Sequence, residues 1–220
     1  MNDETRASPF RASVLRLRRR AAVALAGVLV LGPLLLALPA CRALRQMANL
    51  RNVEFAIDDV ERAELAGIDL GDIRQPEDVD VGDFGQLGVA LAQGEMPMSF
   101  TLMLGANNPA ENEADARLVN MDWTLLLEDR ETISGTFNDN VPLPAGQTTR
   151  VPIDIRLDLL RFFDRGGQDL LELALNVAGV GGEPKNVSLR ARPTVETPVG
   201  PIEYPQPITI EVGEVGDDDF

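Results

Sequence analysis

The sequence has no histidine and only one cysteine, one tryptophan and one tyrosine in 220 residues. Without histidine there is no Ser-His-Asp or Cys-His nucleophile, no histidine-ligated zinc and no imidazole acid or base. The single cysteine, Cys41, allows neither an internal disulfide nor a cysteine-based zinc site. Basic residues are scarce, with 20 Lys and Arg against 35 Asp and Glu, which argues against sequence-independent binding to nucleic acid.

The first 40 residues have the layout of an export signal. Five arginines between residues 11 and 20 precede an uncharged apolar stretch, Ala21 to Ala40. A positive end of this kind stays on the cytoplasmic side while the rest is exported. The next step, Leu38-Pro39-Ala40-Cys41, resembles a bacterial lipobox, in which the cysteine is lipid-modified and becomes the new N-terminus. We therefore predict a lipoprotein signal over 1–40, with Leu38, Pro39 and Ala40 as the lipobox and Cys41 as the lipid attachment site.

A retained signal anchor is the alternative interpretation of this segment. Twenty apolar residues at ~1.5 Å each span roughly 30 Å, the thickness of the hydrocarbon core of a bilayer. Both interpretations export the remainder and hold it at a membrane. Arg42 follows the cysteine, where an aspartate would signal inner-membrane retention, so the sequence favours the periplasmic side of the outer membrane.

Removal of the signal makes the chain more acidic. Residues 41–220 carry 14 basic and 33 acidic side chains, and Lys185 is the sole lysine. The negative charge therefore belongs to the exported part, where it predicts a strongly hydrated surface and like-charge repulsion between copies.

Alternation of apolar and polar residues recurs along the exported part, as in half-buried strands. Such strands are predicted around residues 53–57, 98–104, 119–127, 133–137, 151–157, 171–177, 187–191 and 208–212, with 65–70 as a further partner of the first. The turn 128–131 makes a hairpin of two of them, and Pro152 indicates either an edge strand or the start of a strand. The pattern predicts one all-β, antiparallel sandwich over 51–213, preceded by a tether at 41–50 and followed by an acidic tail at 214–220.

Two segments break the alternation and predict one or two short helices. Residues 83–93 have near-helical apolar spacing, with Asp83 as the N-cap and Gly94 as the C-cap. Residues 157–165 are shorter and end at two glycines. The stretch Gly179 to Pro184 lies between two predicted strands and is interpreted as a hairpin loop.

Residues 98–155 resemble the group-2 late embryogenesis abundant family, also called the water-stress and hypersensitive-response domain. The resemblance is carried by the strand Ser99 to Leu104, by Asn108-Pro109, by Met121 to Leu127, by Ser134-Gly135 and by Val141 to Gly146. It extends over about 50–212 and points to the bacterial lipoprotein branch. It implies an immunoglobulin- or fibronectin-III-like sandwich without catalysis, associated with desiccation and osmotic stress.

Structural explanations suffice for the polar and glycine positions within this block. Asn108 and Pro109 both favour turns, so the pair can simply end a strand. Gly135 is predicted to mark a bulge and Gly146 a hairpin loop. The side chains of Trp123 and Phe100 are predicted to lie in the core, because their neighbours alternate with polar residues.

A search for chemistry leaves few candidates. The acidic stretch 77–83 lacks the glycine and glutamate that an EF-hand requires, and 77–83 or 111–115 could form only a looser calcium site. Asp58 and Asp59 are adjacent in a predicted strand, so their side chains are expected on opposite faces, unable to act as a carboxylate pair. No nucleophile elbow, phosphate loop or dinucleotide motif occurs. We therefore predict no catalytic residue, metal or cofactor.

The leading functional hypothesis is a membrane-anchored, non-enzymatic protein that protects against desiccation or osmotic stress through its acidic, hydrated surface. The alternative is an envelope interaction module that presents loops or a strand edge to a protein or lipid-transport partner. The predicted partners are thus the membrane, through the lipid anchor, and an envelope protein, with no nucleic acid.

Overall fold

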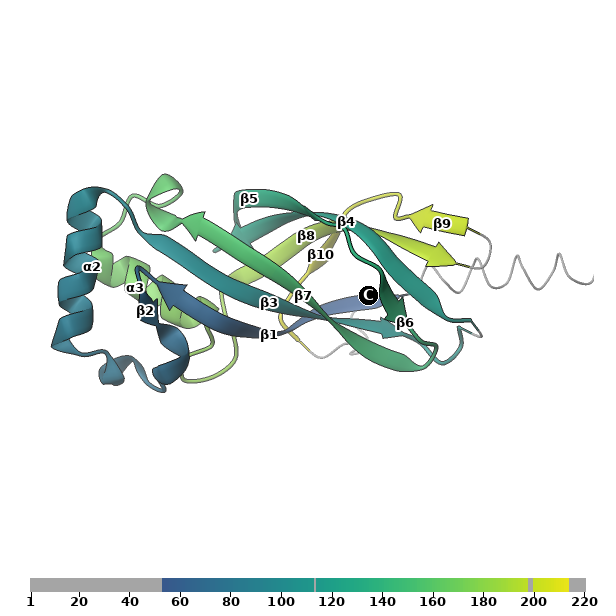
Figure 1. The fold of residues 1–220 in the computed structure, drawn as a ribbon, viewed down its shortest axis with the longest axis horizontal. Helices are drawn as coiled ribbons and strands as arrows, with labels where there is room; N and C mark the ends of the chain where they lie inside the picture. Colours follow the sequence, from purple (N-terminus) through teal and green to yellow (C-terminus); the bar gives the residue numbers. More distant parts are fainter. Residues whose placement is uncertain (1–52, 113, 198–199, 214–220) are drawn as a thin grey trace, which may run out of the picture. The chain divides into compact units, whose positions relative to one another are not determined.

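The computed structural model describes residues 53–112, 114–197 and 200–213. All of them belong to the unit Gln46–Phe220. The predicted signal, the lipobox, Cys41, the tether and the acidic tail lie outside the described residues. Within this unit the chain forms two mostly antiparallel β-sheets and two α-helices (Figure 1).

The first sheet has four antiparallel strands in the order β2-β1-β3-β7. Their bounds are β1 Glu54–Leu65, β2 Ile68–Asp69, β3 Pro97–Asn108 and β7 Gln147–Asp158. Strand β7 lies at the edge, which confirms the prediction made from Pro152, a residue that cannot donate a backbone hydrogen bond. The short β2 is the predicted second partner of the first strand, joined to it through Leu65 and Ile68.

The second sheet has the strand order β10-β8-β4-β5, with β6 beside β4 and β9 beside β8. Their bounds are β4 Ala116–Leu127, β5 Arg130–Phe137, β6 Val141–Leu143, β8 Val187–Thr197, β9 Gly200–Glu203 and β10 Ile208–Ile210. The hairpin predicted around 128–131 is confirmed: Glu128 and Asp129 connect β4 to β5, and both have positive φ, +50° and +61°.

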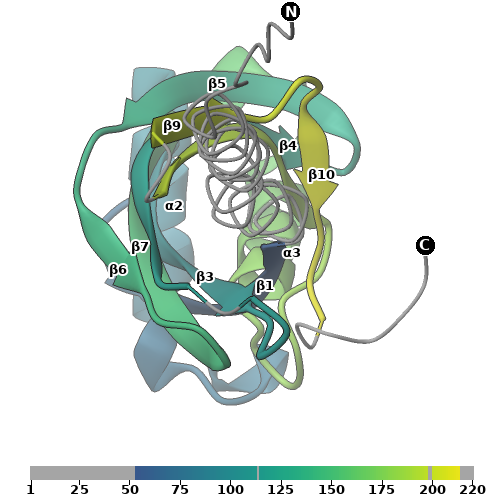
Figure 2. The ribbon, with the colours of Figure 1, turned by 90° about the vertical axis from the view of Figure 1, so that its right-hand side faces the viewer.

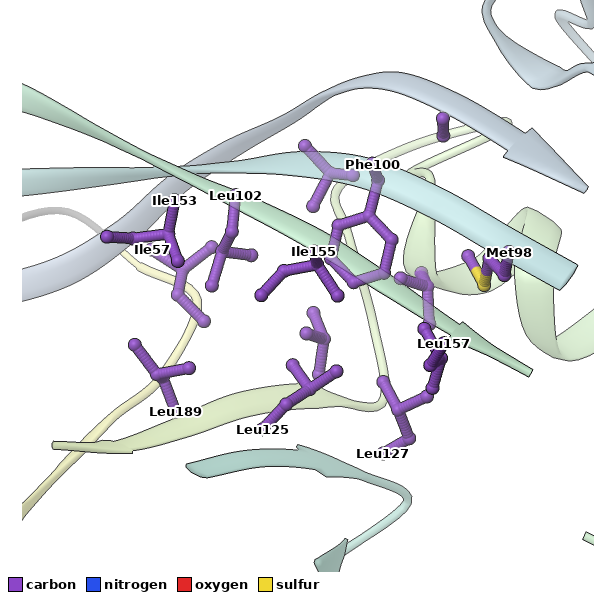
Figure 3. Close-up of a cluster of buried hydrophobic side chains, with 14 of the residues drawn as sticks. Ile57, Met98, Phe100, Leu102, Leu125, Leu127, Ile153, Ile155, Leu157 and Leu189 are labelled. Carbon is purple, nitrogen blue, oxygen red and sulfur yellow. The ribbon is translucent and has the colours of Figure 1, made fainter. Parts of the chain in front are cut away.

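The core lies between the two sheets, which face one another in the end-on view (Figure 2). Along β8 and the second part of β7 every second side chain is buried, so the alternation of the sequence places one face inward. In the first sheet Phe100 pairs with Ile155, and in the second sheet Leu125 pairs with Leu189 (Figure 3). Trp123 is 9% exposed and Phe100 2%, which confirms both as core residues.

Both α-helices lie at one end of the sandwich (Figure 1). They are α2 Val81–Gln93 and α3 Gly167–Val177, with short 3₁₀ turns at Leu70–Asp72, Pro76–Asp78 and Leu159–Arg161. The predicted helix at 83–93 is confirmed, but its N-cap is Asp80; Asp83 instead completes a capping box. Gly94 is the C-cap, in a left-handed conformation with φ +76°.

The strand predicted at 171–177 is wrong, because these residues belong to helix α3. Leu171, Leu173 and Leu175 alternate, but Leu170, Ala174 and Val177 also fit helical spacing, and all six side chains are buried. A helix that is covered by protein on several sides can show both the alternating and the helical spacing of apolar residues. The Leu, Glu and Ala residues of this segment favour a helix. Consequently the loop Gly179 to Pro184 connects α3 to β8 and is not a hairpin loop.

Gly135 does not mark a bulge. The register shift between β4 and β5 lies at residues 132–133, where Leu126 pairs with Glu131 and Thr124 with Ser134. Gly135 pairs directly with Trp123, and a Cβ on Gly135 would lie 2.4 Å from Trp123 Cζ2. The glycine is therefore needed for the close approach of the indole ring. Gly146, with φ +72°, lies in the turn between β6 and β7. These strands belong to different sheets, so the turn is not the predicted hairpin loop.

Candidate functional surface

The positions singled out as acidic loops have structural roles. The Asp78 carboxylate accepts backbone hydrogen bonds from Arg74 and Gln75, and Asp80 and Asp83 cap α2. Asp115 accepts a hydrogen bond from the Ala145 backbone. Among the residues that the structure describes, no group of three or more His, Cys, Asp or Glu side chains could hold a metal ion. Asp78, Asp80, Asp83 and Asp115 thus fix turns and a helix end.

Asp58 and Asp59 lie on the same side of β1, contrary to the sequence prediction. The register of β1 against β3 shifts by one residue between Ile57 and Asp59, so a β-bulge interrupts the alternation. Both carboxylates consequently reach Arg150 on β7, at 2.7 Å from Asp58 and 3.9 Å from Asp59, and Glu61 joins them at 3.3 Å. The hydrogen bond from Arg150 to Asp58 raises the pKa of Arg150. The cluster is a half-exposed ion-pair network, in which Asp58 and Asp59 both face Arg150 and neither stands as an isolated acid or base.

A second bulge in β1 lies between Glu61 and Glu64. Arg62 takes a left-handed backbone conformation there, with φ +55°. Its guanidinium donates to Thr101 Oγ1 at 2.6 Å and to Asp154 Oδ1 at 3.3 Å. The outer face of the first sheet therefore carries two ion-pair networks that link β1 to β7 across β3.

A depression of about 490 Å³ lies on the outer face of the second sheet. Its polar side chains pair with one another: Thr124 with Ser134 at 2.8 Å, and Thr136 donating to Asp122 at 2.8 Å. Arg190 pairs with Glu131. Within the described part of the chain, every buried side-chain nitrogen and oxygen has a hydrogen-bond partner. The depression thus offers no unpaired polar group that would point to a ligand.

The Asn108-Pro109 turn is buried and structural, as the sequence predicts. Asn108 is fully buried, and its amide donates to the Leu143 carbonyl at 2.8 Å and the Ala114 carbonyl at 3.3 Å. Asn112, itself 2% exposed, donates to Asn108 Oδ1 at 2.6 Å. The Asn108 carbonyl accepts from Gly146. This buried amide pair connects Asn112 and Ala114 to Leu143 of β6 and to the β6–β7 turn.

Tyr204, the sole tyrosine, joins the C-terminal part to the start of β1. Its hydroxyl donates to the Val53 carbonyl at 2.9 Å, and its ring packs edge-on against Phe55. Beside it, the Ile57 backbone donates to Glu211 and forms a bridge with Val212, so the two sheets are connected at this edge. Burial raises the pKa of Tyr204 to about 12.

We expect stability to fall as the pH rises from about 10 to about 12, because the unfolded chain releases the tyrosine proton at its ordinary pKa while the folded chain retains it. The loss should reach about 2 to 3 kcal/mol and be absent in Tyr204→Phe, which loses the Val53 hydrogen bond at every pH instead. Urea unfolding across this range measures the difference, and tyrosinate absorbance reports on Tyr204 alone. If the free energy of unfolding of wild type and of Tyr204→Phe changed with pH in parallel, the expectation would be contradicted.

Helix α2 carries the four large hydrophobic side chains that are exposed among the described residues. Val81 is 88% exposed, Phe84 48%, Val89 58% and Leu91 38%. We call this set the α2 apolar surface. The sequence predicted the helix but not its exposure, since the same spacing would serve a buried face. The signal that could have revealed it is composition: no charge occurs from Phe84 to Gly94, although the chain is strongly acidic.

The segment that contains α2, residues 64–95, is rich in acidic side chains, and none of them forms an ion pair with another described residue. Segment 64–95 has one basic residue, Arg74, and eight acids. The acids are Glu64, Asp69, Asp72, Glu77, Asp78, Asp80, Asp83 and Glu95. None of these eight appears in an ion pair with any described residue. Arg165, which precedes α3, by contrast pairs with Glu128 at 2.5 and 3.0 Å, which lowers the pKa of Glu128.

The α2 apolar surface lies at the end of the sandwich opposite to the first described residue. Glu54, at the start of β1, pairs with Asn107, whereas Leu65 at its other end pairs with Met98. Gln86 of α2 donates to the Ala66 carbonyl, just beyond Leu65. The stretch of β3 between these two pairs, Met98 to Asn107, is roughly 30 Å long. About this distance therefore separates α2 from Val53. Figure 1 shows α2 at the end of the sandwich away from the start of β1.

No family model and no curated protein matches the sequence. Among solved structures, a protein from Archaeoglobus fulgidus matches with a TM-score of 0.31 and 10% identity, over 72% of this chain and 99% of its own. A Bordetella pertussis protein described as ApaA matches with a TM-score of 0.29 and 13% identity, over 72% and 98%. These similarities are too weak to assign a family. No helix in the described part of the chain is long and apolar enough to cross a membrane.

Proposed function

We propose that the chain is a non-enzymatic, lipid-anchored envelope protein whose sandwich domain serves as an interaction module, with the α2 apolar surface as its docking site. The observation that carries this proposal is the restriction of exposed large hydrophobic side chains to α2 among the described residues. Patches of this kind on a soluble domain are typical of protein interaction sites.

The domain itself is proposed to be an immunoglobulin- or fibronectin-III-like sandwich of the group-2 late embryogenesis abundant family. The two packed antiparallel sheets support this assignment at the level of architecture. In this interpretation the sandwich is a scaffold, and its two ends differ in role. The end near Val53 holds the buried Asn108 pair, and the helix end presents the docking site.

The test is photo-crosslinking in cells. A photoreactive amino acid replaces Val81, which is 88% exposed on α2. The matched control replaces Thr148, which is exposed at the opposite end of β3 and β7, where it pairs with Asn107. We expect one adduct of discrete mass from position 81 and none from position 148, whereas identical patterns from both positions would contradict a docking site on α2.

Stress protection through an acidic, hydrated surface is the second candidate. It is favoured by the excess of carboxylates over ion pairs: of the 28 acidic side chains among the described residues, seven form ion pairs. Such a protein would limit contacts between envelope components by like-charge repulsion and hydration, without a specific partner. Absence of any adduct from position 81 would favour this candidate over the first.

A further inference from the structure

The sequence of α2 is poorly suited to stabilising the fold. Among its residues only Leu87 is buried, and it contains Gly82, Gly85 and Gly88. A glycine in a helix interior costs about 1 kcal/mol relative to alanine. At Gly85 and Gly88 there is no atom within 4 Å of the place where a Cβ would lie, so no packing constraint inside the domain requires a glycine. Stability of the isolated domain therefore does not account for this helix.

The exposed side chains of α2 share one side of the helix. At about 100° per residue, Val81, Phe84, Val89 and Leu91 fall within an arc of about 160°. Gly85 and Gly88 lie between them on this arc. The glycines leave the backbone open at the centre of the apolar face, which allows another backbone to approach closely.

The charge around α2 restricts what can cover this face. A second copy of the chain would bring another segment 64–95, with its eight acids and one arginine, close to the first, and like charges brought together are unfavourable. A bilayer rich in anionic lipid is repelled for the same reason. A partner that combines an apolar face with bordering Lys or Arg side chains would instead neutralise these carboxylates.

We infer that the α2 apolar surface binds a cationic amphipathic helix of another protein. Its apolar side chains would cover Phe84 and Val89, its backbone would approach Gly85 and Gly88, and its cations would lie near Glu77 and Glu95, which flank α2 on either side in the sequence. This inference rests on the proposed function and specifies the class of partner.

The test uses the full chain in nanodiscs of zwitterionic lipid. The probe is a dye-labelled synthetic helix with leucine on one face and lysine on the other, and fluorescence anisotropy measures its binding. A comparison peptide has glutamate in place of every lysine. Empty nanodiscs are subtracted, and all variants share the same lipid. We expect binding of the lysine peptide at least tenfold tighter than that of the glutamate peptide.

Three variants and one control assign the binding to α2. The double change Phe84→Ser and Val89→Ser should weaken binding of the lysine peptide about tenfold or more, since both side chains would be buried in the complex. Val81→Ser, at a side chain that is 88% exposed, provides a second variant without a folding effect. The change Glu77→Gln with Glu95→Gln should weaken binding severalfold and reduce its dependence on salt. The matched control, Glu196→Gln with Glu211→Gln, removes two exposed acids elsewhere and should leave affinity unchanged.

Several results would overturn the inference. One is equal affinity of the chain for the lysine and glutamate peptides. Another is equal affinity of wild type and the serine variants for the lysine peptide. The third is concentration-dependent dimerisation of the chain that Phe84→Ser abolishes. Crosslinking at position 81 separates this inference from the proposed function. A discrete adduct without binding of the lysine peptide retains the docking site and rejects the cationic partner. Failure of both experiments rejects both proposals.

Discussion

Replacing Asn108 with aspartate is expected to lower the free energy of unfolding by about 4 kcal/mol. The change preserves size and shape but removes the amide that donates to the Leu143 and Ala114 carbonyls. It also places a charge at a fully buried position, facing two carbonyl oxygens. Urea unfolding at neutral pH measures the loss.

Acid pH distinguishes this mechanism from general disruption of the loop. Burial raises the pKa of a carboxyl group, so the carboxyl introduced at position 108 would take up its proton in the folded chain before it does so in the unfolded chain. The difference from wild type should therefore shrink as the pH falls toward 4. Asn140→Asp, the same substitution at an exposed position, should cost less than about 0.5 kcal/mol. Equal losses from the two variants would show that the buried amide pair does not hold the loops together.

Gly135→Ala is expected to cost about 3 kcal/mol, although it adds a single methyl group. The new Cβ would lie 2.4 Å from Trp123 Cζ2 and within 3 Å of two further ring atoms, so the rigid indole ring would have to move. That ring is 9% exposed and lies against β5, which leaves little space for it to move. Chemical denaturation measures the cost.

Two comparisons isolate the contact between Trp123 and Gly135. In a Trp123→Leu background the same Gly135→Ala change should cost less than about 1 kcal/mol, which gives a coupling energy of about 2 kcal/mol. Gly88→Ala, in open space on α2, should stabilise the chain by about 1 kcal/mol. An additive double variant would show that the steric explanation is incorrect.

Residue patterns predicted most of the sandwich because its long strands are buried on one face. The alternation around Phe100, Trp123 and Ile153 assigned β3, β4 and β7, and turn residues assigned the β4–β5 hairpin. Helix α3 was predicted as a strand because a helix covered on several sides can show both periods at once. A structural role for Asn108 could be predicted because asparagine favours turns, and its buried hydrogen bonds confirm that role.

The second half of β1 could not be predicted, because its two bulges change the spacing of buried residues. Ile57, Val60 and Ala63 are buried at intervals of three, which is typical of a helix and not of a strand. A bulge is set by pairing with a neighbouring strand and leaves little local signal. For the same reason the sequence could not predict that Asp58, Asp59 and Glu61 cluster around Arg150. Exposure of α2 is a tertiary property, which local spacing does not report.

The bulges of β1 also affect how copies of the chain behave when they are crowded together. Between Asp58 and Ala63 the outer edge of β1 has no second strand partner among the described residues, so this segment could template the growth of a shared sheet. Two bulges and three carboxylates make that edge irregular and negatively charged. At the other edge of the same sheet, Pro152 removes a backbone donor. The sheet is thereby protected against edge-to-edge aggregation, even at the high local density that attachment to a membrane would produce.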